Sequence, residues 1–231
     1  MSIKAVVFDL DDTLWDVSPV IVRAEKAHYQ WLNQHAPKLT ARFTERELRG
    51  YRMSLAHRHP ELTHFVTRSR MLAMDECLRL SGYGADEAAE LTEQAFAVFW
   101  RFRNRVEPFP YALEALEGLK RNYIIGALSN GNADVFQTPL AEWFDFAFSA
   151  EELSVAKPDS GAFQAVLDHL KCMPQEILFV GDNPEHDIEG AYRMGMRTLW
   201  VQVKSSEKTP AFYDARINCL SQLHQAVTQL A

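Results

Sequence analysis

The feature of this sequence that most constrains its fold is a series of five short apolar runs, rich in β-branched and aromatic residues, that end in small or polar residues. The runs cover residues 5–10, 123–129, 144–149, 177–181 and 198–203. Such short continuous runs are typical of strands that are buried on both faces. Helical patterns, for example YALEALEGLKR and GAFQAVLDHLK, lie between most of them. The alternation predicts an α/β fold in which helices cover both faces of a doubly wound parallel sheet.

The long stretch between the first two runs breaks this alternation, because it shows helical spacing and no strand pattern. Leu91, Ala95 and Phe99, for example, recur on one face of a helix. Thr44 and Glu47 in TERE have the spacing of a capping box, in which each side chain binds the other residue's backbone N–H at a helix start. We expect about four helices in this stretch.

An all-helical block between the first and second strands indicates an inserted domain. The predicted α/β core comprises residues 1–16 and 107–231, and the predicted all-helical cap domain comprises residues 17–106.

Composition narrows the class of protein. The 24 basic and 31 acidic side chains give a net charge of -7, the wrong sign for a protein that neutralises a nucleic-acid backbone. No stretch reaches the roughly 18 apolar residues of a membrane span, and the N-terminal run ends at Asp9, too early for a signal peptide. The three cysteines are far apart, as expected of reduced thiols. We expect a cytoplasmic protein that binds a small molecule and has no nucleic-acid or membrane partner. The sequence does not indicate an oligomeric state.

Polar and charged residues follow the ends of the predicted strands. They are Asp9 and Asp11 after the first run, Ser129 and Asn130 in SNG, Asp182 and Asp187 in GDNPEHD, and Lys157 in AKPD before a helix. In an open parallel sheet the carboxyl ends of the strands meet at one edge, where ligands bind. We therefore expect these side chains to line one crevice.

The carboxylates in such a crevice would repel one another and raise their pKa values unless a cation lay between them. A ligand set made only of oxygen favours a hard cation, and magnesium suits a sparse site because it keeps several waters and bridges to phosphate. Lys157 and the nearby backbone amides would attract an anion. The sequence thus predicts a bound phosphate group and Mg²⁺ as the cofactor.

In this order and at these strand ends, DLDDT, SNG, KP and GDNPEHD resemble the four motifs of the haloacid dehalogenase superfamily. The resemblance covers residues 1–15 and 108–205 and implies a Rossmann-like core, and the helical block resembles the superfamily's cap. It implies that Asp9 is the nucleophile that takes the phosphoryl group as an aspartyl phosphate. Asp11 would be the general acid and base.

The resemblance also implies how the metal and the phosphate are held. Magnesium would be bound by Asp9, the backbone carbonyl of Asp11, and Asp182. Asp187 and Thr13 would lie outside these direct ligands, with Asp187 orienting metal-bound waters or Lys157. Ser129, Asn130 and Lys157 would bind the phosphate oxygens.

Two positions bear on which reaction the family resemblance implies. Many relatives have Gly where this chain has Asp12, a substitution that recurs in the superfamily. Dehalogenase members lack the second Asp of the first motif and displace halide without metal. The presence of Asp11 and Asp182 therefore favours phosphoryl transfer.

Three further stretches, FDLDDTLWDVSPVIVRAEKA, HFVTRSRMLAM and ALSNGNADV, are similar to a bacterial branch of flavin mononucleotide (FMN) phosphatases. The predicted function is a magnesium-dependent phosphoric monoester hydrolase for small phosphomonoesters, with FMN favoured. The alternatives are a phosphosugar or phosphoglycolate phosphatase, a phosphomutase, and a catalytically idle module that binds a partner. A binding module has no physical need for repelling carboxylates, so the intact acidic set argues against the last.

An excess of arginine marks part of the predicted cap. Residues 42–70 contain seven arginines and three glutamates. The patch could face an anionic substrate, with Arg68 and Arg70 as the candidates, or it could be a solvated helix face.

Overall fold

The computed structural model describes residues 2–204 and 209–231. The chain divides into two compact units. The core unit comprises Met1–Val17 and Val106–Ala231, and the helical unit comprises Ser18–Arg105. The domain boundaries expected from the sequence lie one residue from these division points.

The core unit contains a six-stranded sheet in which every neighbouring pair is parallel. Its strands are β1 (Ala5–Phe8), β2 (Ile124–Ser129), β3 (Phe146–Ser149), β4 (Ile177–Gly181), β5 (Arg197–Val201) and β6 (Ala215–Ile217). The order is β3-β2-β1-β4-β5-β6, which places β1 in the middle between β2 and β4. The predicted doubly wound parallel sheet is therefore confirmed.

Register brings the carboxyl ends of the three central strands to one level. Phe8 at the end of β1 lies opposite Ala127 of β2 and Val180 of β4. The residues that follow these positions therefore leave the sheet at the same edge. The sixth strand, β6, was not predicted, because three residues with an exposed Arg216 in the middle show no apolar run.

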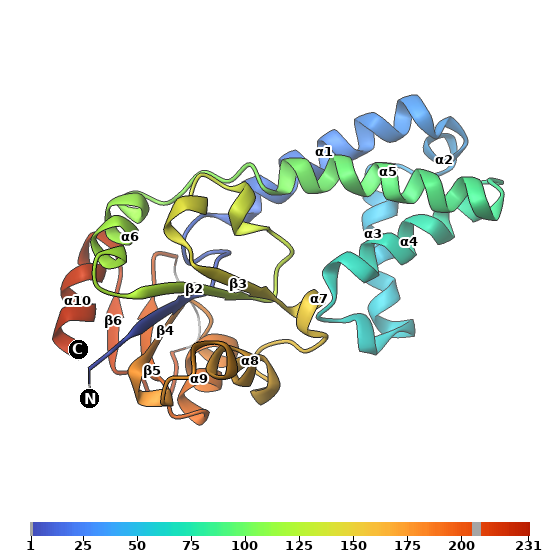
Figure 1. Ribbon diagram of the computed structural model, residues 1–231. Coiled ribbons are helices and arrows are strands. Elements are labelled where there is room, and N and C mark those ends of the chain that lie inside the picture. Colours follow the sequence, from blue (N-terminus) through green and yellow to red (C-terminus); the bar gives the residue numbers. More distant parts are fainter. Residues whose placement is uncertain (1, 205–208) are drawn as a thin grey trace. The chain divides into compact units, whose positions relative to one another are not determined.

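Helices cover both faces of this sheet. They are α6 (Ala112–Lys120), α7 (Ala150–Leu153), α8 (Ser160–Leu170), α9 (Gly190–Arg193) and α10 (Leu223–Leu230), and a π-helical turn, Pro184–Glu189, precedes α9. Within the core unit, α6 lies beside α10 and α8 lies beside α9, one pair on each side of the sheet (Figure 1). This arrangement leaves the carboxyl edge of the strands to loops.

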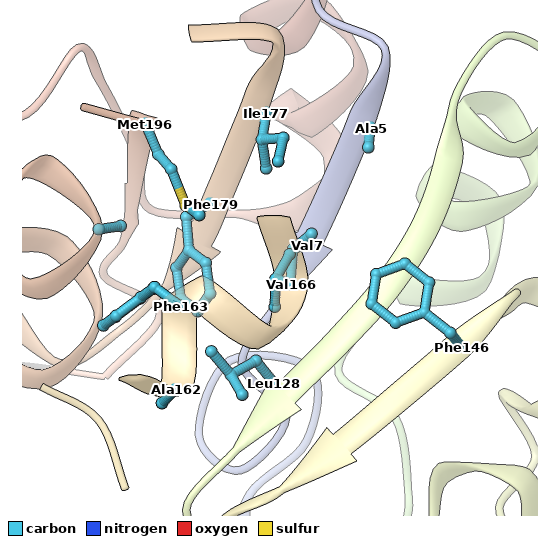
Figure 2. Packing of buried hydrophobic residues seen from close by; sticks show 11 residues of the cluster. Ala5, Val7, Leu128, Phe146, Ala162, Phe163, Val166, Ile177, Phe179 and Met196 are labelled. Carbon is cyan, nitrogen blue, oxygen red and sulfur yellow. The ribbon is translucent and has the colours of Figure 1, made fainter. Parts of the chain in front are cut away.

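The core on the α8 side is built from alternate strand residues. Ala5 and Val7 of β1 face this side and pack with Val166 of α8. The rings of Phe163 and Phe179 meet edge to face with centroids 5.3 Å apart (Figure 2). The packing fixes β1 and β4 relative to each other, and both strands lead directly into the polar edge.

The helices of the helical unit are α1 (Val17–His35), α2 (Pro37–Arg42), α3 (Glu45–Arg58), α4 (Val66–Leu80) and α5 (Ala85–Arg103). The first residue of α1, Val17, belongs to the core unit. The predicted capping box at the start of α3 is confirmed, because Thr44 accepts from the Glu47 N–H and the Glu47 carboxylate accepts from the Thr44 N–H. The short α2 is present in addition to the four helices expected, and Pro37 occupies its first position, where the missing backbone N–H needs no partner. No helix in the described part of the chain is long and apolar enough to cross a membrane.

Candidate active site

A cleft opens at the carboxyl edge of the sheet and lies entirely within the core unit. It measures about 670 Å³, including the solvent at its mouth. Its walls contain seven of the eight residues predicted for the site, Asp9, Asp11, Ser129, Asn130, Lys157, Asp182 and Asp187. The eighth, Thr13, is fully buried behind the cleft. The structure thus brings together residues from the ends of β1, β2 and β4 and from the loop before α8.

Three carboxylates form a compact group in the cleft. Asp9, Asp182 and Asp187 each offer an oxygen atom, and these atoms lie within 4.8 Å of one another. The hydroxyl of Thr13 lies 3.2 Å from Asp182 Oδ1 and 3.4 Å from Asp9 Oδ2. Asp187 was expected to act behind the metal ligands, and the structure places its carboxylate in the group itself. The Asp11 carboxylate is not in the group, in line with the expectation that only the backbone carbonyl of Asp11 binds the metal.

Lys157 neutralises part of this charge. Its Nζ lies 2.7 Å from Asp9 Oδ1 and 2.6 Å from Asp187 Oδ1, and only 1% of the side chain is exposed. Burial alone would lower the pKa of Lys157, but the charges of Asp187 and Asp9 outweigh it and raise the pKa to about 12. The lysine is therefore an ammonium ion at neutral pH.

The remaining charge gives the site its affinity for a cation. Burial raises the pKa of Asp9 well above its usual range, against the opposing charge of Lys157 and with the added repulsion of Asp187. Burial also raises the pKa of Asp182 to about 7, and the charges of Asp187 and Asp12 add to that shift. With all three carboxyl groups ionised and Lys157 protonated, the group carries two negative charges. The raised pKa values of Asp9 and Asp182 show that this ionised state is unfavourable by itself, and a divalent cation with oxygen ligands would balance it. The residues present therefore fit Mg²⁺.

Asn130 positions the backbone that carries Lys157. Its Nδ2 donates to the Lys157 carbonyl at 2.8 Å, and its Oδ1 accepts from the Lys157 N–H at 2.9 Å. Both ends of the Asn130 side chain therefore hold the backbone of the loop that carries Lys157. The Ser129 hydroxyl accepts from the Gly131 N–H at 3.0 Å and remains a donor toward the cleft.

Asp187 depends on the loop that follows β4. A Cβ atom on Gly181 would lie 2.4 Å from Asp187 Oδ2, so a larger residue there would collide with the carboxylate. The same oxygen accepts from the Asn183 N–H at 2.9 Å. Asn183 Oδ1 in turn accepts from the N–H groups of Glu185 and His186, which fixes the start of the π-helical turn.

The loop after β1 orders the other acidic residues. Asp12 has a φ of 61°, a region that favours glycine but that Asp tolerates better than most residues. Its Oδ1 accepts from the Val17 N–H at 3.0 Å and lies 2.7 Å from Lys204 Nζ. Lys204 also lies 2.6 Å from Asp16, so it ties this loop to the end of β5.

Two tryptophans contact the acidic residues and were not predicted. Trp15 Nε1 donates to Asp11 Oδ1 at 2.8 Å, and Trp200 Nε1 donates to the Asp182 carbonyl at 2.9 Å. Both side chains are fully buried. In the sequence they look like ordinary core residues, and for that reason their hydrogen bonds to the site were not predicted.

Several arginines of the helical unit are used within that unit. Arg70 is only 8% exposed, its Nη1 lies 2.9 Å from Glu25 Oε1, and its guanidinium lies 3.6 Å from the centroid of the Phe99 ring. Arg58 pairs with Glu76 at 2.9 Å. Arg70 therefore joins α4 to α1 and α5 and does not form part of an exposed patch.

Comparisons with known proteins identify the family that this chain matches. Residues 3–195 match the model of the haloacid dehalogenase-like hydrolase family. YigB of Escherichia coli, described as a 5-amino-6-(5-phospho-D-ribitylamino)uracil phosphatase, is 31% identical over 205 residues, which cover 89% of this chain and 86% of YigB.

Dehalogenases also match over almost the whole chain. The (S)-2-haloacid dehalogenase 4A of Burkholderia cepacia is 27% identical over 231 residues, covering 96% of this chain and 94% of that protein. A crystal structure described as a 2-haloacid dehalogenase from Pseudomonas syringae pv. Tomato DC3000 has a TM-score of 0.90 and 39% identity, and the match covers 99% of this chain and 100% of that one.

Proposed function

The chain belongs to the haloacid dehalogenase-like hydrolases, and from that premise we propose that it is a magnesium-dependent phosphatase of small phosphomonoesters. The observation that carries the proposal is the grouping of Asp9 with Lys157, which it contacts, and with the carboxylates of Asp182 and Asp187. Asp11 lies two residues further along in the same cleft. A nucleophile, a fixed cation, a cation-binding group and a second carboxylate are the parts that phosphoryl transfer requires.

In the first step a carboxylate oxygen of Asp9 attacks the phosphorus atom of the ester. The bond between phosphorus and the leaving oxygen breaks, the carboxyl group of Asp11 gives its proton to that oxygen, and an alcohol leaves. The product on the enzyme is an aspartyl phosphate at Asp9. Lys157 stabilises the phosphoryl oxygens through its ammonium group, and Ser129 and the Asn130 N–H donate hydrogen bonds to them.

In the second step a water molecule attacks the same phosphorus atom. Asp11, now a carboxylate, takes a proton from the water, the bond between phosphorus and the Asp9 oxygen breaks, and phosphate is released. A bound Mg²⁺, held by Asp9, Asp182 and the Asp11 carbonyl, would supply charge neutralisation for the phosphate oxygens. Asp187 holds the Lys157 ammonium in place at 2.6 Å.

For the substrate we propose FMN or a similar ester of a ribityl chain. The compound named in the description of YigB carries a phosphate on a ribityl chain attached to a nitrogen heterocycle, and FMN has the same chemical plan. The helical unit is proposed to act as a cap that selects the substrate. Phosphosugar and phosphoglycolate esters, and phosphomutase activity, are the alternatives within this chemistry. We place the protein in the cytoplasm, acting on a phosphorylated metabolite.

A second candidate is hydrolysis of 2-haloacids, which is favoured by the 39% identity to a protein described as a 2-haloacid dehalogenase. The same Asp9 would then attack carbon and displace halide, and no metal would be needed. Asp11 and the acidic group that fits a cation have no part in that reaction, and for this reason we favour the phosphatase.

One panel of assays separates these functions. The purified protein is given p-nitrophenyl phosphate, FMN, phosphoglycolate and hexose phosphates with Mg²⁺, and free phosphate is measured. In parallel it is given (S)-2-chloropropionate, and chloride is measured. We expect phosphate release that is highest for FMN and absent in Asp9→Asn. Chloride release without phosphate release would overturn the proposal in favour of the dehalogenase, and activity on neither class would leave the idle binding module.

A further inference from the structure

A tight turn places Trp15 beside Asp11. The Leu14 N–H donates to the Leu10 carbonyl at 2.9 Å, and the Asp12 N–H donates to the Trp15 carbonyl at 2.8 Å. The turn folds the chain back so that the Trp15 indole N–H donates to Asp11 Oδ1 at 2.8 Å. The orientation of the Asp11 carboxylate is thus set by a side chain four residues away.

The indole ring itself is held firmly. Trp15 is 0% exposed, so its rotamer is fixed by packing on all sides. Its backbone forms β-bridges with Asp11 and with Pro108, and the Phe109 N–H donates to the Leu14 carbonyl at 2.8 Å. Trp15 therefore lies where the chain leaves the core unit and where it returns, anchored from both sides.

The hydrogen bond restricts how Asp11 can carry a proton. An indole N–H is a donor and cannot accept, so the oxygen that it binds must act as an acceptor in both the protonated and the ionised carboxyl group. Protonation of Asp11 is consequently favoured at the other oxygen, Oδ2, because a protonated oxygen is the weaker acceptor for the indole N–H. A general acid whose proton has one preferred position can be aligned with the leaving oxygen before the reaction begins.

We propose that Trp15 is a positioning residue for the acid–base group: its indole N–H holds Oδ1 of Asp11 and thereby fixes the orientation in which the carboxyl group gives its proton to the leaving oxygen. This inference rests on the proposed phosphatase function. Trp15 does not itself touch the reacting atoms, and its effect is transmitted only through Asp11.

The effect of Trp15 must then depend on the leaving group. An alkyl ester such as FMN or glycerol 2-phosphate needs protonation of its leaving oxygen, whereas p-nitrophenolate leaves readily without it. We expect Trp15→Phe, which keeps an aromatic ring and removes the N–H, to lower kcat/KM on the alkyl esters about ten- to a hundredfold. The kcat/KM on p-nitrophenyl phosphate should change less than about threefold, because this constant reports the transfer to Asp9 and not the later hydrolysis that all esters share.

Trp143→Phe is the matched control, because the buried Trp143 Nε1 has no hydrogen-bond partner in the described part of the chain. It removes the same atom from the core unit and should leave the ratio of alkyl to aryl kcat/KM unchanged. A double-mutant cycle completes the test: in an Asp11→Asn background, Trp15→Phe should have no further effect on that ratio.

The inference is overturned, and Trp15 is a packing residue, if Trp15→Phe leaves the ratio of alkyl to aryl kcat/KM unchanged. It is overturned equally if Trp15→Phe changes this ratio as much in the Asp11→Asn background as in the wild type. Should Trp15→Phe not fold, Trp15→His offers an N–H at the equivalent ring position, and its ratio is expected to stay near that of the wild type; a collapsed ratio would contradict the inference. A wild-type protein that releases no phosphate from any ester would instead overturn the proposed function.

Discussion

At the scale of single residues, the site depends on small distances around Asp187. This carboxylate binds Lys157 Nζ at 2.6 Å and occupies the space that a side chain on Gly181 would need. Lys157 in turn reaches Asp9, so a shift of Asp187 is passed on to the nucleophile. The glycine is therefore as much a part of the site as the charged residues.

We predict that Gly181→Ala lowers kcat on p-nitrophenyl phosphate at least tenfold and destabilises the core unit by about 1–3 kcal/mol, the usual cost of overpacking. The added Cβ would lie 2.4 Å from Asp187 Oδ2 and force the carboxylate away from Lys157. Steady-state kinetics and chemical denaturation measure the two effects. If a folded Gly181→Ala protein kept the wild-type kcat, the position of the Asp187 carboxylate beside Lys157 would not matter for activity.

Gly50→Ala is the matched contrast, since Gly50 lies inside α3 and a Cβ there would meet nothing within 4 Å. We predict that this variant is more stable than the wild type by about 0.5–1 kcal/mol, because glycine is a poor residue in a helix interior. Its activity should be unchanged. A lower unfolding midpoint would contradict the packing described for α3.

At the scale of elements, an ion pair connects helices of the helical unit. Arg70 of α4 reaches Glu25 of α1 at 2.9 Å, and His28 lies 3.8 Å from the same carboxyl group. Burial alone would raise the pKa of Glu25, but the nearby His28 and the charge and hydrogen bond of Arg70 lower it to about 2. Burial lowers the pKa of Arg70 to about 10, while Glu25 opposes that shift.

This pair predicts a pH dependence of stability. The pKa of Glu25 is lower in the folded protein than its ordinary value of 4.5, so its stabilising contribution is present above pH 4.5 and is lost as the pH falls toward about 2. Glu25→Gln should therefore be less stable than the wild type at pH 7, and the difference in melting temperature should shrink as the pH falls from 5 to about 3. Glu93→Gln, at an exposed position of α5, is the control. A difference that stays constant with pH would rule out this ionisation.

At the scale of the whole molecule, the sequence predicted what depends on repeating patterns. Buried runs gave the sheet, and the common edge of its strands gave the neighbourhood of Asp9, Lys157 and Asp182, which are distant in the chain. Side-chain partners were less predictable, because Lys157 binds carboxylates 148 and 30 residues away and periodicity does not select them. The role of Arg70 inside the helical unit was missed for the same reason.

The whole charge balance of the cleft predicts its response to metals. Excess chelator should abolish phosphatase activity, Mg²⁺ should restore it, and Ca²⁺ should not, because calcium takes more ligands at longer distances and disturbs the alignment of the reacting groups. Mg²⁺ should also raise the melting temperature, since the ion would relieve the repulsion among the three carboxylates. Full phosphatase activity in excess chelator would exclude a catalytic role for the metal.

The central claim is that Asp9 accepts a phosphoryl group, and the most direct measurement is the mass of the peptide that contains it. The Asp11→Asn variant, in which hydrolysis of the intermediate should be slow, is mixed with p-nitrophenyl phosphate and Mg²⁺, quenched in acid, digested and analysed by mass spectrometry. We predict one added phosphoryl group on Asp9 and none in the Asp9→Asn, Asp11→Asn double variant. Release of p-nitrophenol with an unmodified Asp9 peptide, or a phosphoryl group on another residue, would contradict the account.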